Sequence, residues 1–353
     1  MKKWSGIFWC CCAGLLYPSA TCRAGVSMRS RFFLRVLLAV IFLAATDSFF
    51  PACAGDGMTA HVPLFALRPD HLPMIASVSV GGGPSSPVSL DTGSAGLYVP
   101  ERDIGPGTVA TGEVVHQGYA DGTRLEGYVA LATVRFTDAD RTLSTPAPIR
   151  VGVITRVYCA QDRPNCPGSI DKPGVMGISL ATRRHVVSPL AQMGPYSTGY
   201  IIDSRLGHNP VLTVGLTENN IRDFTFAPLR SFQSGPDHLP SWDGESVSAC
   251  FAIDGIRVGC QETVFDSGST VTLFSPGSSD IPLTRHHRLP PDHVFVLDVP
   301  DVLHFAVRTD RTTVIVPKDV EHANSGTLLY RYFAVAFDSL RGRVGFFGHQ
   351  ENR

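Results

Sequence analysis

The sequence is short of charged residues, and neither sign dominates. Charged side chains make up 17% of the 353 residues, and the formal net charge is −1. The lysines and arginines of the first 54 residues outnumber the acids there by six to one, which leaves the rest of the chain mildly acidic. A mildly acidic body gives no reason to expect nucleic-acid binding. Its acidity is also too weak to indicate a protein specialised for strong acid.

A membrane-spanning stretch is not evident near the start of the chain. The apolar run at residues 36–45 is ten residues long, whereas a spanning helix needs about 20. A basic segment at residues 28–35 precedes the run, and Ala-Cys-Ala at residues 52–54 follows it. This layout predicts a secretory signal peptide cleaved before Gly55. A membrane anchor and a lipid attached through Cys53 are the alternatives, opposed by the length of the run and by the residues before Cys53.

Residues 1–27 look like a second, partial targeting sequence, so Met28 is the expected start unless the upstream part is also removed. The sequence has no Asn-x-Ser/Thr glycosylation signal. We therefore expect an exported protein, periplasmic or secreted and of bacterial origin, with no stable membrane span after processing.

Few cysteines remain once the targeting segment is set aside. The sequence has nine, and five of them precede Gly55. An even number in an exported protein indicates disulfides, and four cysteines allow three pairings. We predict the two local pairs because each closes a short loop: Cys159–Cys166 and Cys250–Cys260. A two-residue turn at Asp254 and Gly255 would place the second pair on opposite faces, so that bridge requires a longer turn or a bulge.

The spacing of these four cysteines along the chain does not resemble that of a zinc-binding motif. Three histidines, His286, His287 and His293, share a loop rich in proline. Such a loop is more often plain surface than a metal site, so no metal is expected.

Apolar residues are plentiful, at 44%, and they are accompanied by 34 glycines and 26 prolines. This composition is typical of a globular, turn-rich, all-β protein, and the length allows two domains.

Two short segments have the same form. Residues 88–94 read Val-Ser-Leu-Asp-Thr-Gly-Ser, and residues 263–270 read Thr-Val-Phe-Asp-Ser-Gly-Ser-Thr. In each, an apolar run predicts a buried strand that ends in an acid, and the glycine predicts a tight turn. The repetition indicates two similar lobes that each deliver one carboxylate, Asp91 or Asp266, to a shared site.

Two carboxylates held close together cannot both ionise easily, so one of them keeps a proton. The charged one can then act as base on a water molecule while the protonated one donates to a carbonyl oxygen. Hydroxyl groups and glycine amides beside each acid can hold the two carboxylates coplanar. The residues expected to do so are Thr92, Gly93, Ser94, Ser267, Gly268 and Ser269.

These motifs resemble the active-site stretches of the pepsin-like, two-lobed aspartic peptidases. Residues 90–100 match the first stretch, with Tyr98 where the family usually has Trp, and residues 265–270 match the second. The resemblance runs to Gly348. It implies an all-β, bilobal fold with the active-site cleft between the lobes, and catalysis by Asp91 and Asp266.

A flap is the next implied feature. Residues 117–128 read as a hairpin, and in the family this hairpin folds over the substrate. Tyr119 matches the flap tyrosine, and Asp121 and Gly122 form the expected tip, as in plant members. A closing flap excludes water from the substrate.

Other stretches match the family in order, with one departure. Residues 174–178 resemble the segment that braces the first active-site loop. Residues 199–203 and 211–215 resemble a hairpin late in the first lobe. Residues 326–338 resemble the last interlobe segment. Residues 186–193 predict a short helix with Ser188 as cap and Pro189 at its first position. The family has two apolar residues before the glycine that matches Gly326, whereas this chain has Asn324 and Ser325, so this brace is polar.

The resemblance implies an endopeptidase that needs no cofactor and takes a polypeptide substrate. The lobe cores and the disulfides indicate a monomer. We expect residues 1–54 to form the targeting segment, residues 55–230 the N-terminal lobe and residues 231–353 the C-terminal lobe. Only 36 residues separate Gly55 from Asp91, so no inhibitory propeptide is expected. The alternative is a pepsin-fold binding or inhibitor protein that has lost catalysis. A half-length, dimeric enzyme is excluded because both motifs lie in one chain.

Overall fold

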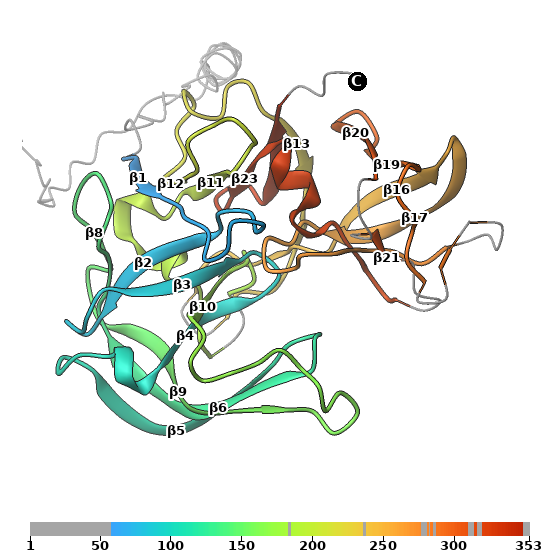
Figure 1. Ribbon diagram of the computed structural model, residues 1–353. Coiled ribbons are helices and arrows are strands. Elements are labelled where there is room, and N and C mark those ends of the chain that lie inside the picture. Colours follow the sequence, from blue (N-terminus) through green and yellow to red (C-terminus); the bar gives the residue numbers. More distant parts are fainter. Residues whose placement is uncertain are drawn as a thin grey trace, which may run out of the picture. The chain divides into compact units, whose positions relative to one another are not determined.

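The computed structural model describes residues 58–182, 185–235, 238–276, 281, 283–284, 287–309, 314–315 and 320–348. The predicted targeting segment, His286 and the last five residues lie outside these ranges, so the signal peptide and its alternatives stay predictions. Gly55–Arg353 forms one compact unit. Strands account for almost all of the regular secondary structure in its described part (Figure 1), which confirms the all-β fold class. No helix in these ranges is long and apolar enough to cross a membrane.

The first sheet carries the first Asp motif. Its strand order is β5-β6-β9-β4-β10-β3-β2-β7-β8. The bounds are β2 Ile75–Val80, β3 Ser86–Asp91, β4 Ala95–Pro100, β5 Val109–Gly118, β6 Thr123–Ala132, β7 Val134–Phe136, β8 Leu143–Ser144, β9 Ile149–Cys159 and β10 Gly174–Ile178. The strand that ends at Asp91, β3, pairs antiparallel with β2.

The second sheet carries the second motif and has the order β20-β19-β16-β17-β22-β18-β21. The bounds are β16 Val247–Ile253, β17 Ile256–Val264, β18 Thr272–Leu273, β19 Val294–Val299, β20 Leu303–Arg308, β21 Val314–Ile315 and β22 Ala323–Asn324. In the first sheet β3 runs parallel to β10, which is antiparallel to β4. In the second sheet β17 runs parallel to β22, which is antiparallel to β18. The two motifs therefore sit in equivalent strand arrangements.

A third sheet joins strands from early and late in the chain, in the order β1-β12-β11-β23-β24-β13 (Figure 1). The bounds are β1 Ala60–Pro63, β11 Gly199–Asp203, β12 Val211–Val214, β13 Thr225–Pro228, β23 Ala334–Asp338 and β24 Arg343–Phe347. The predicted pairing of residues 199–203 with residues 211–215 is formed by β11 and β12. A two-stranded ribbon, β14 Arg230–Ser231 with β15 Trp242–Asp243, follows β13. The lobe boundary at residues 230 and 231 stays a prediction.

The helices of the described ranges are short and of the 3-10 type: η1 Glu101–Asp103, η2 Pro189–Gln192, η3 Gly194–Tyr196 and η4 Gly326–Arg331. The helix expected over residues 186–193 is thus the shorter η2. Its cap is as predicted, since the Ser188 side chain accepts a hydrogen bond from the Leu190 amide at 3.2 Å.

The core fixes the strands that end at the two acids. Val88 and Leu90 before Asp91, and Phe265 before Asp266, are buried. Close packing around these buried side chains leaves little freedom for the residue that follows. Each acid is therefore delivered to a defined place.

Both predicted disulfides are formed between the local pairs. Cys159 and Cys166 are joined, as are Cys250 and Cys260, with Cα–Cα distances of 5.4 and 3.9 Å. In the second pair the two cysteines lie directly opposite each other on β16 and β17. The required bulge follows Phe251, where the strand register shifts. It lets a tight turn at Asp254 coexist with two cysteines on one face.

Candidate active site

The two predicted acids, Asp91 and Asp266, lie close together in the structure. Asp91 is the last residue of β3, and Asp266 follows β17 by two positions; their exposed fractions are 8% and 9%. A Cβ added to Gly93 would lie 2.8 Å from the carboxyl carbon of Asp266, and one added to Gly268 would lie 2.6 Å from that of Asp91. Each motif's glycine is therefore what allows the carboxylate of the other motif to come close. Both glycines are exposed.

The two motifs are also tied to each other through their backbones. The Thr92 amide donates to the Ser267 hydroxyl at 3.1 Å, and the Ser267 amide donates to the Thr92 hydroxyl at 2.9 Å. The Thr92 hydroxyl in turn donates to the carbonyl of Phe265, and the Ser267 hydroxyl to that of Leu90. The sequence predicts that these hydroxyls hold the carboxylates directly. They instead cross to the opposite motif, which fixes the two turns against each other.

Each carboxylate accepts one hydrogen bond from a backbone amide and one from a neutral side chain. Oδ1 of Asp91 accepts from the Gly93 amide at 2.9 Å, and its Oδ2 accepts from the Ser94 hydroxyl at 2.5 Å. Oδ1 of Asp266 accepts from the Gly268 amide at 2.7 Å. Gly93, Ser94 and Gly268 therefore make the contacts expected of them.

The side-chain donor to Asp266 is not the expected one. The Ser269 hydroxyl donates to the backbone carbonyl of Val271 at 2.8 Å, and among the described residues it forms no hydrogen bond to Asp266. The donor is Asn324, whose Nδ2 lies 2.6 Å from Oδ2 of Asp266. The polar brace that departs from the family pattern thus contacts the acid itself. Its second residue, Ser325, is buried and accepts through its carbonyl from the Thr272 hydroxyl.

The electrostatics of Asp91 are dominated by its burial. Burial is the largest cause acting on Asp91, followed by repulsion from Asp266. Together with a hydrogen bond shared by the two carboxyl groups, they raise the pKa of Asp91 to about 7, despite the opposing donors Ser94 and Gly93. Asp91 therefore keeps its proton across the mildly acidic range, which is the condition for one acid and one base to coexist at the site.

Two buried tyrosines behind the acids were not predicted. The Tyr330 hydroxyl of η4 donates to the Phe265 carbonyl at 2.8 Å and lies 3.3 Å from the Thr92 hydroxyl. The Tyr200 hydroxyl of β11 donates to the Ile178 carbonyl at 2.6 Å. Burial raises the pKa of both phenols. Nothing local in the sequence separates these tyrosines from ordinary core residues, because their partners lie far away in the chain.

The predicted hairpin over residues 117–128 is present as the turn between β5 and β6. Asp121 accepts a hydrogen bond from the Thr123 amide, and Gly122 has a φ of +95°, a conformation that favours glycine. The Tyr119 hydroxyl is buried and has no hydrogen-bond partner among the described residues. Burial, and next the charge of Asp91, raises the pKa of Tyr119. The tyrosine therefore lies within electrostatic reach of Asp91, while its action as a flap stays a prediction.

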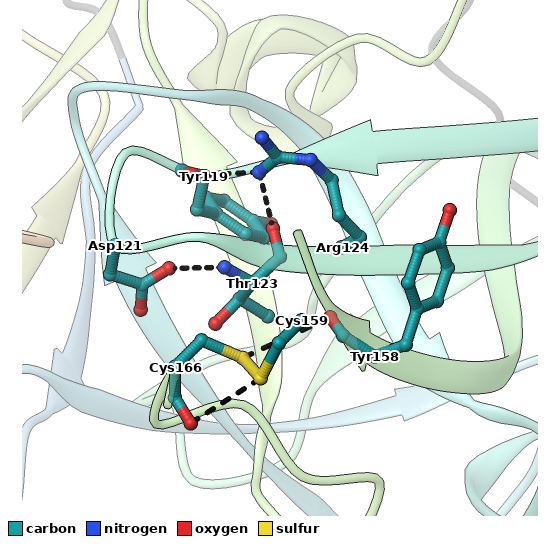
Figure 2. The surroundings of a disulfide bond; sticks show 7 residues. All are labelled: Tyr119, Asp121, Thr123, Arg124, Tyr158, Cys159 and Cys166. Atoms are coloured by element: carbon teal, nitrogen blue, oxygen red, sulfur yellow. Dashed lines mark hydrogen bonds between the residues drawn. A yellow bond between two sulfur atoms is a disulfide. The ribbon is translucent and has the colours of Figure 1, made fainter. Parts of the chain in front are cut away.

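The loop closed by the Cys159–Cys166 disulfide packs against the tip of this hairpin. Figure 2 shows the disulfide beside Thr123, with Asp121 and Tyr119 on the turn. The Ala160 amide donates to the Gly122 carbonyl at 2.8 Å, and the Arg163 guanidinium donates to the Ala120 carbonyl. The disulfide loop therefore supports the hairpin tip through hydrogen bonds to the backbone carbonyls of Ala120 and Gly122.

In the part of the chain that the structure describes, no group of three or more His, Cys, Asp or Glu side chains is arranged to hold a metal ion. His293 is engaged instead with Asp254, at 2.6 Å.

Comparison with known proteins agrees with the fold. Residues 60–224 are similar to the family described as the PE-PGRS C-terminal aspartyl peptidase-like domain. The matched segment includes Asp91 and the Tyr119 hairpin and ends before Asp266. No curated protein matches the chain. The match and the sheets together support an all-β, aspartyl-peptidase-like fold.

Proposed function

We propose that the protein is an aspartic endopeptidase of the pepsin-like, two-lobed kind, with Asp91 and Asp266 as its catalytic residues. The observation that carries the proposal is the mutual approach of the two acids. Each carboxylate lies against the other motif's glycine, Gly93 or Gly268. Two buried carboxyl groups in contact share a proton. Such a pair supplies both an acid and a base, and it can activate water without a metal or a covalent intermediate.

The reaction would proceed through a tetrahedral intermediate. The ionised carboxylate takes a proton from water as the water oxygen attacks the peptide carbonyl carbon. The protonated carboxyl group gives its proton to the carbonyl oxygen, which yields a gem-diol. The C–N bond then breaks as the leaving nitrogen is protonated, and the pair returns to its starting state with one proton.

We further propose that the hairpin carrying Tyr119 closes over a polypeptide substrate, and that the protein acts as an exported monomer. The two disulfides support an oxidising location. The arrangement of residues 1–54 as a targeting segment, followed by lobes at residues 55–230 and 231–353, belongs to the same proposal.

The test is cleavage of a denatured protein substrate by the purified, disulfide-bonded protein between pH 3 and pH 9. Asp91→Asn and Asp266→Asn should each abolish cleavage, and pepstatin should inhibit the unmodified protein. Asp70→Asn is the matched control, because Asp70 is exposed and outside the site. Failure of the folded, unmodified protein to cleave would instead favour a binding or inhibitor protein with the same fold.

A further inference from the structure

The two carboxylates of the site receive chemically different side-chain donors. Ser94 supplies a hydroxyl to Asp91, and Asn324 supplies an amide NH₂ to Asp266, at 2.5 and 2.6 Å. A hydroxyl both donates and accepts, so it can serve a carboxyl group with or without a proton. An amide NH₂ only donates, so it favours a carboxylate that has no proton.

The orientation of the Asn324 side chain is fixed by a second contact. Its Oδ1 accepts a hydrogen bond from the backbone amide of Gly326 at 2.8 Å. Because that amide can only donate, its partner must be the carbonyl oxygen of the side chain. The NH₂ group is therefore the end that faces Asp266.

The position of Gly326 is itself fixed. Its φ is +57°, and a Cβ there would lie 2.3 Å from the carbonyl oxygen of Val271. Only glycine fits this backbone without strain. The amide that orients Asn324 is therefore held in place by the fold.

The equivalent position in the first half carries an apolar residue. Asn324 pairs with the residue two positions before Asp266 on β17 and with the one seven positions after it on β18. Val175 has the same two pairings relative to Asp91, on β3 and β4. Valine offers Asp91 no hydrogen bond. The amide at Asn324 is thus specific to the second half of the site.

Ser269 occupies the position that corresponds to Ser94, three residues after the acid, yet its hydroxyl donates to Val271. The Val271 amide donates back to the Ser269 hydroxyl at 3.3 Å. Asn324 therefore takes the place at Asp266 that Ser94 takes at Asp91.

We propose that Asn324 is a positioning residue that holds the negative charge on Asp266 and leaves the shared proton on Asp91. The inference rests on the proposed function for its role in catalysis. Asp266 is then the base that takes a proton from water, and Asp91 the acid that protonates the carbonyl oxygen. When the C–N bond breaks, Asp266 gives its proton to the leaving nitrogen and Asp91 regains one from the gem-diol.

The surroundings agree with this division. Burial and the charge of Asp266 favour the protonated form of Asp91. Among the described residues, the charges of Asp91 and Asp266 also act on Tyr119 on the hairpin, Tyr200 on β11 and Tyr330 on η4. Burial raises the pKa of all three, so they stay neutral across the assay range and do not compete for the charge.

The decisive variant combines Asn324→Val, which copies Val175, with Ser269→Ala, which prevents the nearby hydroxyl from replacing the lost donor. Asn324→Asp keeps the shape of the side chain but supplies no donor once ionised. Asn219→Val is the matched control, since Asn219 is exposed and lies outside the site.

Two readouts are needed. The first is carbon-13 NMR of the full protein labelled at the aspartate carboxyl carbons, with the two signals assigned through Asp91→Asn and Asp266→Asn. In the unmodified protein Asp266 should titrate at lower pH than Asp91. In the double variant the titration of Asp266 should move up by about one pH unit or more, as expected when a hydrogen bond to an ionised group is lost.

The second readout is the pH dependence of kcat/KM, whose acidic limb should move up by the same amount in the double variant and at least as far in Asn324→Asp. An unchanged acidic limb and an unchanged titration of Asp266 in the folded double variant would overturn the inference, as would titration of Asp91 before Asp266. If the unmodified protein cleaves nothing, the proposed function fails, while the NMR titration still decides the role of Asn324.

Discussion

The burial of Asp91 predicts that this acid weakens the fold at neutral pH. Its pKa rises from 3.8 to about 7 in the folded protein. Between these two values the folded state binds more protons at this site than the unfolded state does, so stability must fall as pH rises through this window and level off above it. One pKa unit corresponds to about 1.36 kcal/mol, so Asp91 should destabilise the fold by up to about 4 kcal/mol at pH 8.

The perturbation that isolates this cost is Asp91→Asn, which is neutral at every pH and nearly the same shape. The new Nδ2 can donate to the Ser94 hydroxyl, and Oδ1 can still accept from the Gly93 amide. We expect little difference from the unmodified protein at pH 4. The free energy of unfolding should be higher in the variant by an amount that grows toward pH 8, up to about 4 kcal/mol.

The assay is urea unfolding followed by tryptophan fluorescence at pH 4, 6 and 8. A second series in the Asp266→Asn background removes self-digestion and the repulsion between the acids. The gain from Asp91→Asn should be smaller there but not zero, because burial is the larger cause. A gain that does not change with pH would refute the description of Asp91 as an acid buried beside a second carboxylate.

Three further changes test other parts of the site. Thr92→Val keeps the side-chain volume but leaves the Ser267 amide without its acceptor, so it should lower the free energy of unfolding in urea by about 1–3 kcal/mol. A double-mutant cycle with Ser267→Ala should show coupling between the two residues. Strictly additive effects would contradict the crossed contacts. Gly268→Ala places a methyl group against the Asp91 carboxylate and should abolish cleavage. It should do so without removing the near-ultraviolet circular dichroism of the folded protein; normal cleavage would rule out the described approach of the acids. Replacing both cysteines of the Cys159–Cys166 pair by serine should loosen the hairpin tip, raise KM and speed amide exchange at Gly122. The same change at Cys250–Cys260 should leave that exchange as it was, and equal effects would count against the support role.

Patterns local in the sequence predicted much of this site. An apolar run ending in Asp-Thr-Gly or Asp-Ser-Gly predicted where Asp91 and Asp266 would lie, because a buried strand leaves the next residue little freedom. The bulge beside Cys250 followed from the two-residue alternation of strands. The turn at Gly122 followed from its Asp-Gly tip.

Contacts between distant residues could not be predicted in the same way. The rotation of the Ser269 hydroxyl toward a neighbouring carbonyl depends on the backbone of its own turn. The contact of Asn324 with Asp266 spans 58 positions. The sequence shows only that Asn324 makes this brace polar where the family has an apolar residue. Its side chain has both of its polar atoms paired, so it is a specific part of the site.

In the proposed function, two carboxyl groups with one proton between them hydrolyse peptide bonds. The most direct test is kcat/KM for a denatured substrate between pH 3 and pH 9, measured for the unmodified protein, Asp91→Asn and Asp266→Asn. We predict cleavage that falls as pH rises through about 7, as Asp91 loses its proton, and no cleavage by either variant at any pH. Cleavage that persists in either asparagine variant, or that is undiminished at pH 9, would contradict it.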